Sequence, residues 1–292
     1  MHEDNIRAGR RVLPEHLAAL LLALLTWQGT ALAGAAPAGM VENPCPPVYE
    51  MPVELRAVLE GLFIEPRVLQ PADFGRLAMA PGFAEMEKSN RERAATDWAG
   101  LCRFRTDNAR IAASERPRVV LMGDSITENW SMVDPGFFTR GIVNRGIGGQ
   151  TSAQMLVRFR ADVVALRPAA VHILAGTNDI AGNGGPTSPQ DFRNNIQSMV
   201  DLARANGIRV ILGAIPPADQ FSWRPGMQPA PVISAQNDWL REYAARNGLG
   251  FIDYHAALVG SHQELRAELG NDGVHPNRTG YLIMRKLAEE AL

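Results

Sequence analysis

Three residues of this chain have the types and the order along the sequence that acyl transfer through a serine requires. Ser125 follows the apolar run "VVLMGD" (119–124), where a buried strand is expected to end in a tight turn. Asp272 and His275 lie three positions apart in "NDGVHPN", so one turn of chain can bring the carboxylate beside the imidazole. In such a set the hydroxyl attacks a carbonyl, the imidazole takes its proton, and the carboxylate fixes the imidazole tautomer. Taken alone, the motif around Ser125 is also an ordinary turn or helix cap.

Two further motifs contain donors that could stabilise an oxyanion. Gly149 lies in "NRGIGGQTS" (144–152), where glycine lets the backbone approach a substrate closely. Asn178 lies in "GTND" and carries a side-chain amide donor. Each motif also has a plainer interpretation, as a strand-to-helix turn or a helix cap. A nucleotide-binding loop is disfavoured because the Gly-x-Gly-x-x-Gly spacing and the P-loop lysine are both missing.

From residue 116 onward, short apolar segments alternate with amphipathic ones. Strands are expected within residues 117–124, 141–147, 169–179, 209–217 and 248–254. Helices are expected within residues 152–166, 189–207, 231–248 and 277–292. This alternation predicts a parallel sheet with helices on both faces. Binding sites in such folds lie beyond the carboxyl ends of the strands, which is where the polar motifs fall.

Together the motifs resemble the SGNH hydrolase superfamily, also called GDSL-type esterases and lipases. "GDSIT", "NRGIGGQT", "GTND" and "DGVHPN" match its four blocks in order and spacing, over residues 116–292. The resemblance implies a three-layer α/β/α sandwich of flavodoxin type with a five-stranded parallel sheet, and no metal or organic cofactor. It implies that Ser125 is the nucleophile, His275 the base and Asp272 its partner. The N–H groups of Ser125 and Gly149 and the side chain of Asn178 would form the oxyanion hole.

The chain departs from this pattern at two positions. Ile126 replaces the leucine of the name-giving motif, which is a conservative change. Gln150 stands where many members have an aspartate, so this chain has no acid at that position. Within the superfamily, the segment is similar to small secreted bacterial esterases related to platelet-activating-factor acetylhydrolase subunits and carbohydrate acetylesterases.

Other polar residues compete for a place in the site. His172 lies inside the third expected strand and is expected to be a packed, hydrogen-bonded histidine. Asp253 ends the fifth expected strand and His255 follows it, so the two are candidates for a rival acid–base pair at the sheet edge. Asp124 and Asp179 adjoin the main motifs, where turn and loop hydrogen bonds are their expected roles.

The N-terminal region predicts export. Residues 1–33 contain an arginine pair, an apolar run of about ten residues and small residues before a cleavage site after Ala33, as in a secretory signal peptide. The run is shorter than the roughly 20 residues that span a bilayer, so stable membrane insertion is not expected. Residues 34–115 are interpreted as a linker and a small helical extension, and 116–292 as the hydrolase domain. An oxidising compartment favours a disulfide between Cys45 and Cys102, with two buried thiols as the alternative.

Composition and motifs favour a secreted or periplasmic serine esterase that acts on short, acetyl-type esters of carbohydrates or small molecules. The net charge is −2 and no basic cluster occurs, which disfavours a nucleic-acid partner. Trp130 and Trp223 are expected in loops near the site, where their rings could bind a sugar or an acyl group. A lysophospholipase or thioesterase and a non-catalytic carbohydrate-binding protein remain alternatives. The oligomeric state stays open.

Overall fold

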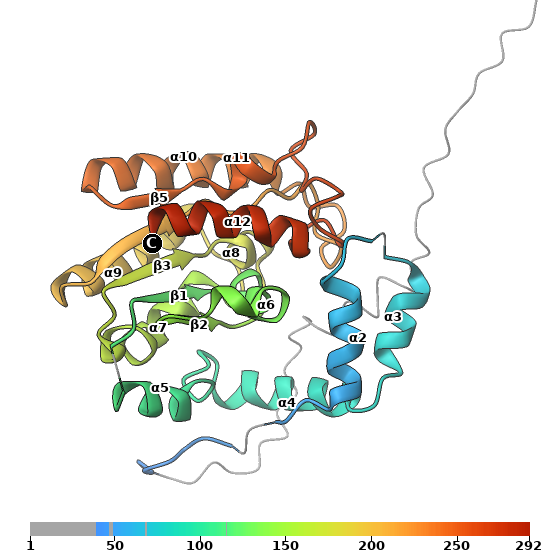
Figure 1. Cartoon of the computed structure of the whole chain (residues 1–292), viewed down its shortest axis with the longest axis horizontal. Coiled ribbons are helices and arrows are strands. Elements are labelled where there is room, and N and C mark those ends of the chain that lie inside the picture. The colour runs from blue at the N-terminus through green and yellow to red at the C-terminus, as the bar shows by residue number, and fades with distance from the viewer. Residues whose placement is uncertain (1–38, 47–48, 68, 115) are drawn as a thin grey trace, which may run out of the picture.

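The computed structural model describes residues 39–292 except 47–48, 68 and 115 (Figure 1). Its centre is a parallel sheet of five strands in the order β2-β1-β3-β4-β5. The strands are β1 Val119–Gly123, β2 Ile142–Gly146, β3 Ala170–Leu174, β4 Arg209–Gly213 and β5 Gly250–Ile252. Each one lies within a segment that the sequence predicts to be a strand. The expected five-stranded parallel sheet is therefore confirmed.

Helices cover both faces of this sheet, which gives the predicted three layers (Figure 1). One face packs against helices α7 Ser152–Asp162, α9 Pro189–Ala205 and α10 Ala230–Asn247. The other face packs against helices α6 Ser125–Val133, α11 Tyr254–Leu258 and α12 Arg278–Ala291. Side chains along β1 alternate between these two cores, because Val120 and Met122 enter the first while Val119 and Leu121 enter the second. Shorter helices lie at α8 Thr177–Ala181, η1 Pro135–Phe137 and η2 Val164–Leu166.

Helix α6 corrects the sequence interpretation of the segment after Ser125. This segment was expected to be a loop, yet it is helical from Ser125 to Val133. The carboxylate of Asp124 accepts the N–H of Ile126 at 2.9 Å and so caps the first turn. Apolar side chains on one side of the helix, among them Ile126 and Trp130, are buried against the sheet. The cap and this burial together stabilise a helix that the mixed polar sequence does not reveal.

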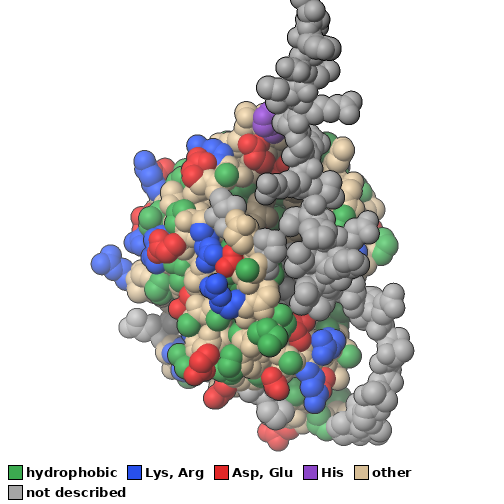
Figure 2. Space-filling model, turned by 90° about the vertical axis from the view of Figure 1, so that its right-hand side faces the viewer, with side chains coloured by type: hydrophobic (Ala, Val, Ile, Leu, Met, Phe, Trp, Pro, Cys, Tyr) green, Lys and Arg blue, Asp and Glu red, His purple; other side chains and the backbone are tan. Residues whose placement is uncertain are grey.

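The expected helical extension precedes the sheet. It contains α2 Val53–Phe63, α3 Pro71–Ala78, α4 Phe83–Thr96 and α5 Arg105–Ala112. Helices α2 and α3 stand beside the sheet edge at which the strands end, and α4 and α5 run below the sheet in the view of Figure 1. Helix α4 ends at Thr96, and in the turn that follows the carboxylate of Asp97 accepts the N–H groups of Leu101 and Cys102. In Figure 2, the described surface on this side carries basic and acidic side chains interspersed with hydrophobic ones.

The predicted disulfide between Cys45 and Cys102 is present. It joins the segment before α2 to the turn that follows α4. The predicted signal peptide, residues 1–33, lies outside the described residues, and the boundary at residue 115 stays a prediction. In the part of the chain that is described, no helix is long and apolar enough to cross a membrane.

Candidate active site

The order of the strands brings the motifs together. In the sheet, β1 lies between β2 and β3, and Gly123 at its end is level with Gly146 on one side and Leu174 on the other. The loops that follow these strands carry Ser125, the glycine motif and the asparagine motif. Their meeting point is where the strand order changes direction, which is the usual position of a binding site in an open parallel sheet.

Ser125, His275 and Asp272 form a continuous hydrogen-bonded chain. The Oγ atom of Ser125 lies 2.8 Å from Nε2 of His275, and Nδ1 of His275 lies 2.6 Å from Oδ2 of Asp272. The other oxygen of Asp272 accepts the backbone N–H groups of Val274 and His275, at 2.9 and 2.7 Å. The carboxylate is thereby fixed by its own loop before it orients the imidazole. This arrangement suits a hydroxyl nucleophile with an oriented base.

The imidazolium form of His275 and the carboxylate of Asp272 stabilise each other. Burial disfavours the cation of His275, but the charge and hydrogen bond of Asp272, with a contribution from Asp124, outweigh it and raise the pKa of His275. Burial likewise opposes ionisation of Asp272, yet the imidazolium and the backbone N–H groups keep the pKa of that carboxyl low. The site therefore stabilises an imidazolium opposite a carboxylate, which is the charge state that forms once the serine proton has been transferred.

The glycine loop passes close to Ser125. A Cβ atom built on Gly148 would lie 3.7 Å from Cβ of Ser125 and 3.0 Å from Oε2 of Glu128. Gly149 has a φ of +77°, a left-handed conformation that favours glycine. The N–H of Gly148 donates to Glu128 at 2.7 Å, whereas the N–H of Gly149 has no acceptor among the described residues. The loop thus leaves the N–H of Gly149 without an acceptor among the described residues, one position after the glycine that approaches Ser125.

The side chain of Asn178 is buried and held in one orientation by its neighbours. Its Nδ2 atom donates to Oδ2 of Asp124 and to the carbonyl of Gln150, both at 3.1 Å. Its Oδ1 accepts the amide of Asn183 at 2.5 Å, and Oδ1 of Asn183 accepts the indole N–H of Trp223 at 3.2 Å. Because an indole N–H can only donate and a carboxylate can only accept, the direction of the whole chain is determined.

Asp124 and Asp179 have the structural roles that the sequence predicts for them. Asp124 caps α6 and accepts Asn178, and burial raises the pKa of its carboxyl to about 6, against the opposing effect of the Ile126 N–H. Asp179 accepts the N–H and hydroxyl of Ser152, at 2.9 and 2.5 Å, and so ties the asparagine motif to the start of α7.

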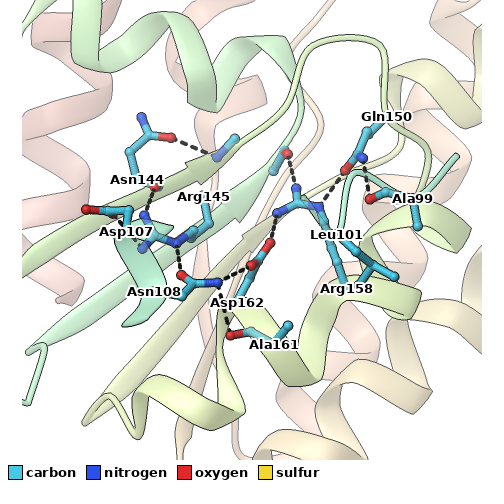
Figure 3. Close-up of polar contacts among 12 residues, drawn as sticks. Ala99, Leu101, Asp107, Asn108, Asn144, Arg145, Gln150, Arg158, Ala161 and Asp162 are labelled. Carbon is cyan, nitrogen blue, oxygen red and sulfur yellow. Dashed lines mark hydrogen bonds and ion pairs between the residues drawn. The ribbon is translucent and has the colours of Figure 1, made fainter. Parts of the chain in front are cut away.

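Gln150 belongs to a buried polar network beneath the glycine loop (Figure 3). Its Oε1 accepts Nε of Arg158 at 2.6 Å, and its Nε2 donates to the carbonyl of Ala99 at 2.8 Å. Arg158 is fully buried, pairs with Asp162 at 2.9 Å and also donates to the carbonyl of Gly123. The side chain of Gln150 therefore connects the glycine loop to the N-terminal extension.

Three residues that compete with the motifs in the sequence, His172, Asp253 and His255, form no hydrogen bond with the motif residues in the described part of the chain. His172 is fully buried, lies 3.2 Å from the hydroxyl of Tyr254, and burial lowers its pKa to about 4, as expected of a packed histidine. Asp253 caps α11 and pairs with Arg241 at 2.7 Å, so the rival pair with His255 is not formed.

The two tryptophans differ from their prediction in different ways. The expectation for Trp130 is wrong: it lies in helix α6 with no exposed surface, and it stacks on Phe137 and Tyr281 in the core. A buried ring cannot contact a substrate. Trp223 is partly exposed in the loop after β4, where it stacks on Phe221 and donates to Asn183. Its contact with a substrate stays a prediction.

Three residues near the motifs were missed by the sequence interpretation. Glu128 holds the glycine loop, Asn183 holds Asn178, and Phe63 lies against the imidazole of His275. Only Glu128 had a local signal, since it follows Ser125 by three positions and so shares a face of α6 with it. Within the described residues, no group of three or more His, Cys, Asp or Glu could hold a metal ion.

Comparisons with known proteins identify the family of this chain. A sequence model of the GDSL-like lipase/acylhydrolase family matches residues 121–283, more than half of the chain. A solved structure of a proposed acylhydrolase from Bacteroides fragilis is 46% identical, with a TM-score of 0.64, and the match covers 66% of this chain and 96% of that one.

Two curated relatives cover less of this chain. Esterase TesA of Pseudomonas aeruginosa is 29% identical over 172 residues, which are 54% of this chain and 79% of that protein. The lipoprotein YqeF of Bacillus subtilis, of uncharacterised function, is 42% identical over 74 residues, which are 24% of this chain and only 30% of that protein. From the family match and the similar acylhydrolase, the chain belongs to the GDSL-like lipase/acylhydrolase family of carboxylic ester hydrolases.

Proposed function

We propose that this protein hydrolyses carboxylic esters through an acyl-enzyme intermediate on Ser125. The observation that carries the proposal is the unbroken chain from Ser125 Oγ to His275 Nε2, at 2.8 Å, and from His275 Nδ1 to Asp272, at 2.6 Å. His275 takes the serine proton as Oγ attacks the carbonyl carbon, and it returns that proton to the departing alcohol. Water then attacks the acyl carbon while His275 takes its proton, and His275 gives that proton to Oγ of Ser125 as the acyl–Oγ bond breaks and the acid leaves.

The oxyanion of the tetrahedral intermediate is assigned to three donors. The N–H of Ser125 is the first of helix α6, the N–H of Gly149 has no acceptor among the described residues, and Asn178 lies in helix α8, which follows β3. Nδ2 of Asn178 donates to Asp124 and to the carbonyl of Gln150, both at 3.1 Å, and in the proposed reaction one of these bonds is exchanged for a bond to the oxyanion. Donors fixed in advance stabilise charge that develops only in the transition state.

Short acyl groups, acetyl in particular, and a carbohydrate alcohol are the proposed substrate. The glycine loop lies close to Ser125, since a Cβ atom built on Gly148 would lie 3.7 Å from Cβ of Ser125, and a short acyl group suits so narrow a space. One feature favours a second candidate, an ester with a longer acyl chain such as a lysophospholipid or thioester. A cavity of about 180 Å³ adjoins helix α8, and its apolar lining includes Ile180, Phe192, Ile215 and Met227.

Export to the periplasm or the medium is part of the proposal. The disulfide between Cys45 and Cys102 suits an oxidising compartment. The relative YqeF is a lipoprotein, which supports an extracytoplasmic location. N-terminal sequencing of the protein recovered from the culture medium or periplasm tests the predicted cleavage after Ala33.

A substrate screen separates the two candidates. The purified mature protein is assayed on p-nitrophenyl esters of rising acyl length, on acetylated xylan and on a lysophospholipid. The first candidate expects the highest kcat/KM on the acetyl ester and release of acetate from the polysaccharide. A maximum at a long acyl chain, with lysophospholipid hydrolysed and xylan untouched, would favour the second. The Ser125→Ala variant is the control for hydrolysis that does not use this site.

A further inference from the structure

Phe63, the last residue of helix α2, lies beside the imidazole of His275. The two ring centroids are 6.2 Å apart and the ring planes meet at 72°, an edge-to-face contact. Both side chains are partly exposed. Phe63 lies outside residues 121–283, so this contact comes from a part of the chain that the family match does not include.

Hydrogen bonds on both sides of Phe63 hold its backbone against the loop that carries His275. The carbonyl of Leu62 accepts the side-chain amide of Asn271 at 2.7 Å, and the carbonyl of Ile64 accepts the N–H of Arg278 at 2.7 Å. Asn271 and Arg278 stand on either side of the Asp272–His275 segment in the sequence. These bonds hold the backbone on both sides of Phe63 against the segment that carries His275, and the edge-to-face contact joins the two rings.

The chemistry places the alcohol half of the ester next to this pair of rings. In acylation, the imidazole must return the proton to the alcohol oxygen as the C–O bond breaks. That oxygen must therefore come within about 2.6–3.2 Å of Nε2 of His275. The group attached to the oxygen then extends along the surface beside the imidazole. Among the described residues, Phe63 is the aromatic ring that pairs with His275 there.

We infer that Phe63 binds the alcohol portion of the ester and so determines which leaving groups the enzyme accepts. This inference rests on the proposed function, in which Ser125 is acylated and His275 protonates the leaving group. A phenyl ring offers an apolar surface to an alcohol that itself carries a ring with an apolar face, such as an acetylated sugar or an aryl alcohol. It offers much less to a two-carbon alcohol. The N-terminal extension thereby contributes a substrate-binding residue to the site.

The test compares alcohols at constant acyl group, in the full chain. Wild type, Phe63→Ala and Phe63→Tyr are assayed on ethyl acetate, phenyl acetate and an acetylated methyl xyloside. The matched control is Phe83→Ala, because Phe83 is also partly buried and packs in the same cluster of the extension. For Phe63→Ala we expect a loss in kcat/KM on the order of tenfold on the two ring-bearing esters, about 1.4 kcal/mol. We expect less than a twofold change on ethyl acetate and recovery in Phe63→Tyr.

A second readout separates alcohol binding from support of the imidazole. Once the alcohol has left, the acyl-enzyme is identical for all three esters, so its hydrolysis should be unchanged in Phe63→Ala. The pre-steady-state burst rate should fall while the rate of acyl-enzyme hydrolysis stays constant.

Different results would contradict the role of Phe63 and the proposed function. Equal losses on all three esters, or slower acyl-enzyme hydrolysis, would show that Phe63 supports His275 and would overturn the inference. No loss on any ester, or the same selective loss in Phe83→Ala, would overturn it as well. If wild type prefers longer acyl groups, the same three alcohols are compared with that acyl group. If it hydrolyses no ester, the proposed function itself fails, and the assignment of Phe63 fails with it.

Discussion

The Oγ atom of Ser125 lies 2.8 Å from Nε2 of His275, although 150 positions separate the two residues in the sequence. Ser125 begins helix α6 directly after β1, and His275 lies just before α12. Both helices pack on the same face of the sheet, where the hydroxyl of Tyr281 in α12 donates to the carbonyl of Ile126 in α6 at 2.7 Å. The packing of two helices therefore sets the distance between the proposed nucleophile and its base.

Replacement of Ser125 by alanine tests the nucleophile. The hydroxyl is a single atom at the partly exposed start of α6, so its removal should leave the melting temperature nearly unchanged. Loss of one member of a catalytic triad lowers turnover by roughly 10⁴- to 10⁶-fold. We expect a loss of that size on an acetyl ester, measured with the Michaelis constant and a thermal melt. Activity within tenfold of wild type would refute the assignment.

The chain of hydrogen bonds from Trp223 through Asn183 to Asn178, here called the relay, can be tested by a double-mutant cycle. Asn178→Ala should lower kcat by roughly 10²- to 10³-fold with little change in KM, as for loss of an oxyanion donor. Asn183→Ala should lower kcat by about tenfold, because Asn178 loses the partner at 2.5 Å that orients its amide. In the double variant, Asn183→Ala should cost nothing further. Additive losses would mean that Asn183 acts elsewhere.

Trp223→Phe is the matched variant for this relay. It keeps an aromatic ring on Phe221 but removes the N–H that donates to Asn183. A fall in kcat that disappears in the Asn178→Ala background would support the relay. A rise in KM that persists in that background would instead support the predicted contact of Trp223 with the substrate.

The dependence of activity on pH tests the base and its partner. His275 accepts a proton only when neutral, so kcat/KM should fall as the pH drops through its pKa. Because Asp272 raises that pKa against the effect of burial, half-maximal activity should lie above 6.5. In Asp272→Asn the charge is lost, so the residual activity should be much lower and its midpoint should move to lower pH. An identical rate and profile in the variant would contradict the role of Asp272.

The disulfide should affect stability more than activity. The bonded cysteines are 57 positions apart, for which the chain-entropy model gives about 4 kcal/mol of stabilisation. The turn at Cys102 is also held by Asp97, and Gln150 bonds the carbonyl of Ala99 independently of the bridge. Reduction should therefore lower the melting temperature and leave kcat/KM on ethyl acetate nearly unchanged well below it. A parallel loss of activity in the still-folded protein would show that the bridge supports the glycine loop.

Local patterns in the sequence determined the sheet and the order of the motifs. The strand-forming runs and the helical periodicity that alternates with them placed all five strands, because these signals depend on neighbours within a few positions. Parallel strands then bring the loops at their carboxyl ends to one edge. For this reason the sequence already placed Ser125, Gly149 and Asn178 at one sheet edge.

Contacts between distant segments decided the positions of Trp130, Asn183 and Phe63. Trp130 was expected near the substrate, but a cap at Asp124 and burial of one face turned its segment into a helix. Asn183 and Phe63 carry no motif, and their positions follow from hydrogen bonds to Asn178 and from the bonds that flank Phe63. Such contacts join residues up to about 200 positions apart, as between Leu62 and Asn271, and no local periodicity encodes them. Only the tertiary structure therefore placed the N-terminal extension against the proposed catalytic base.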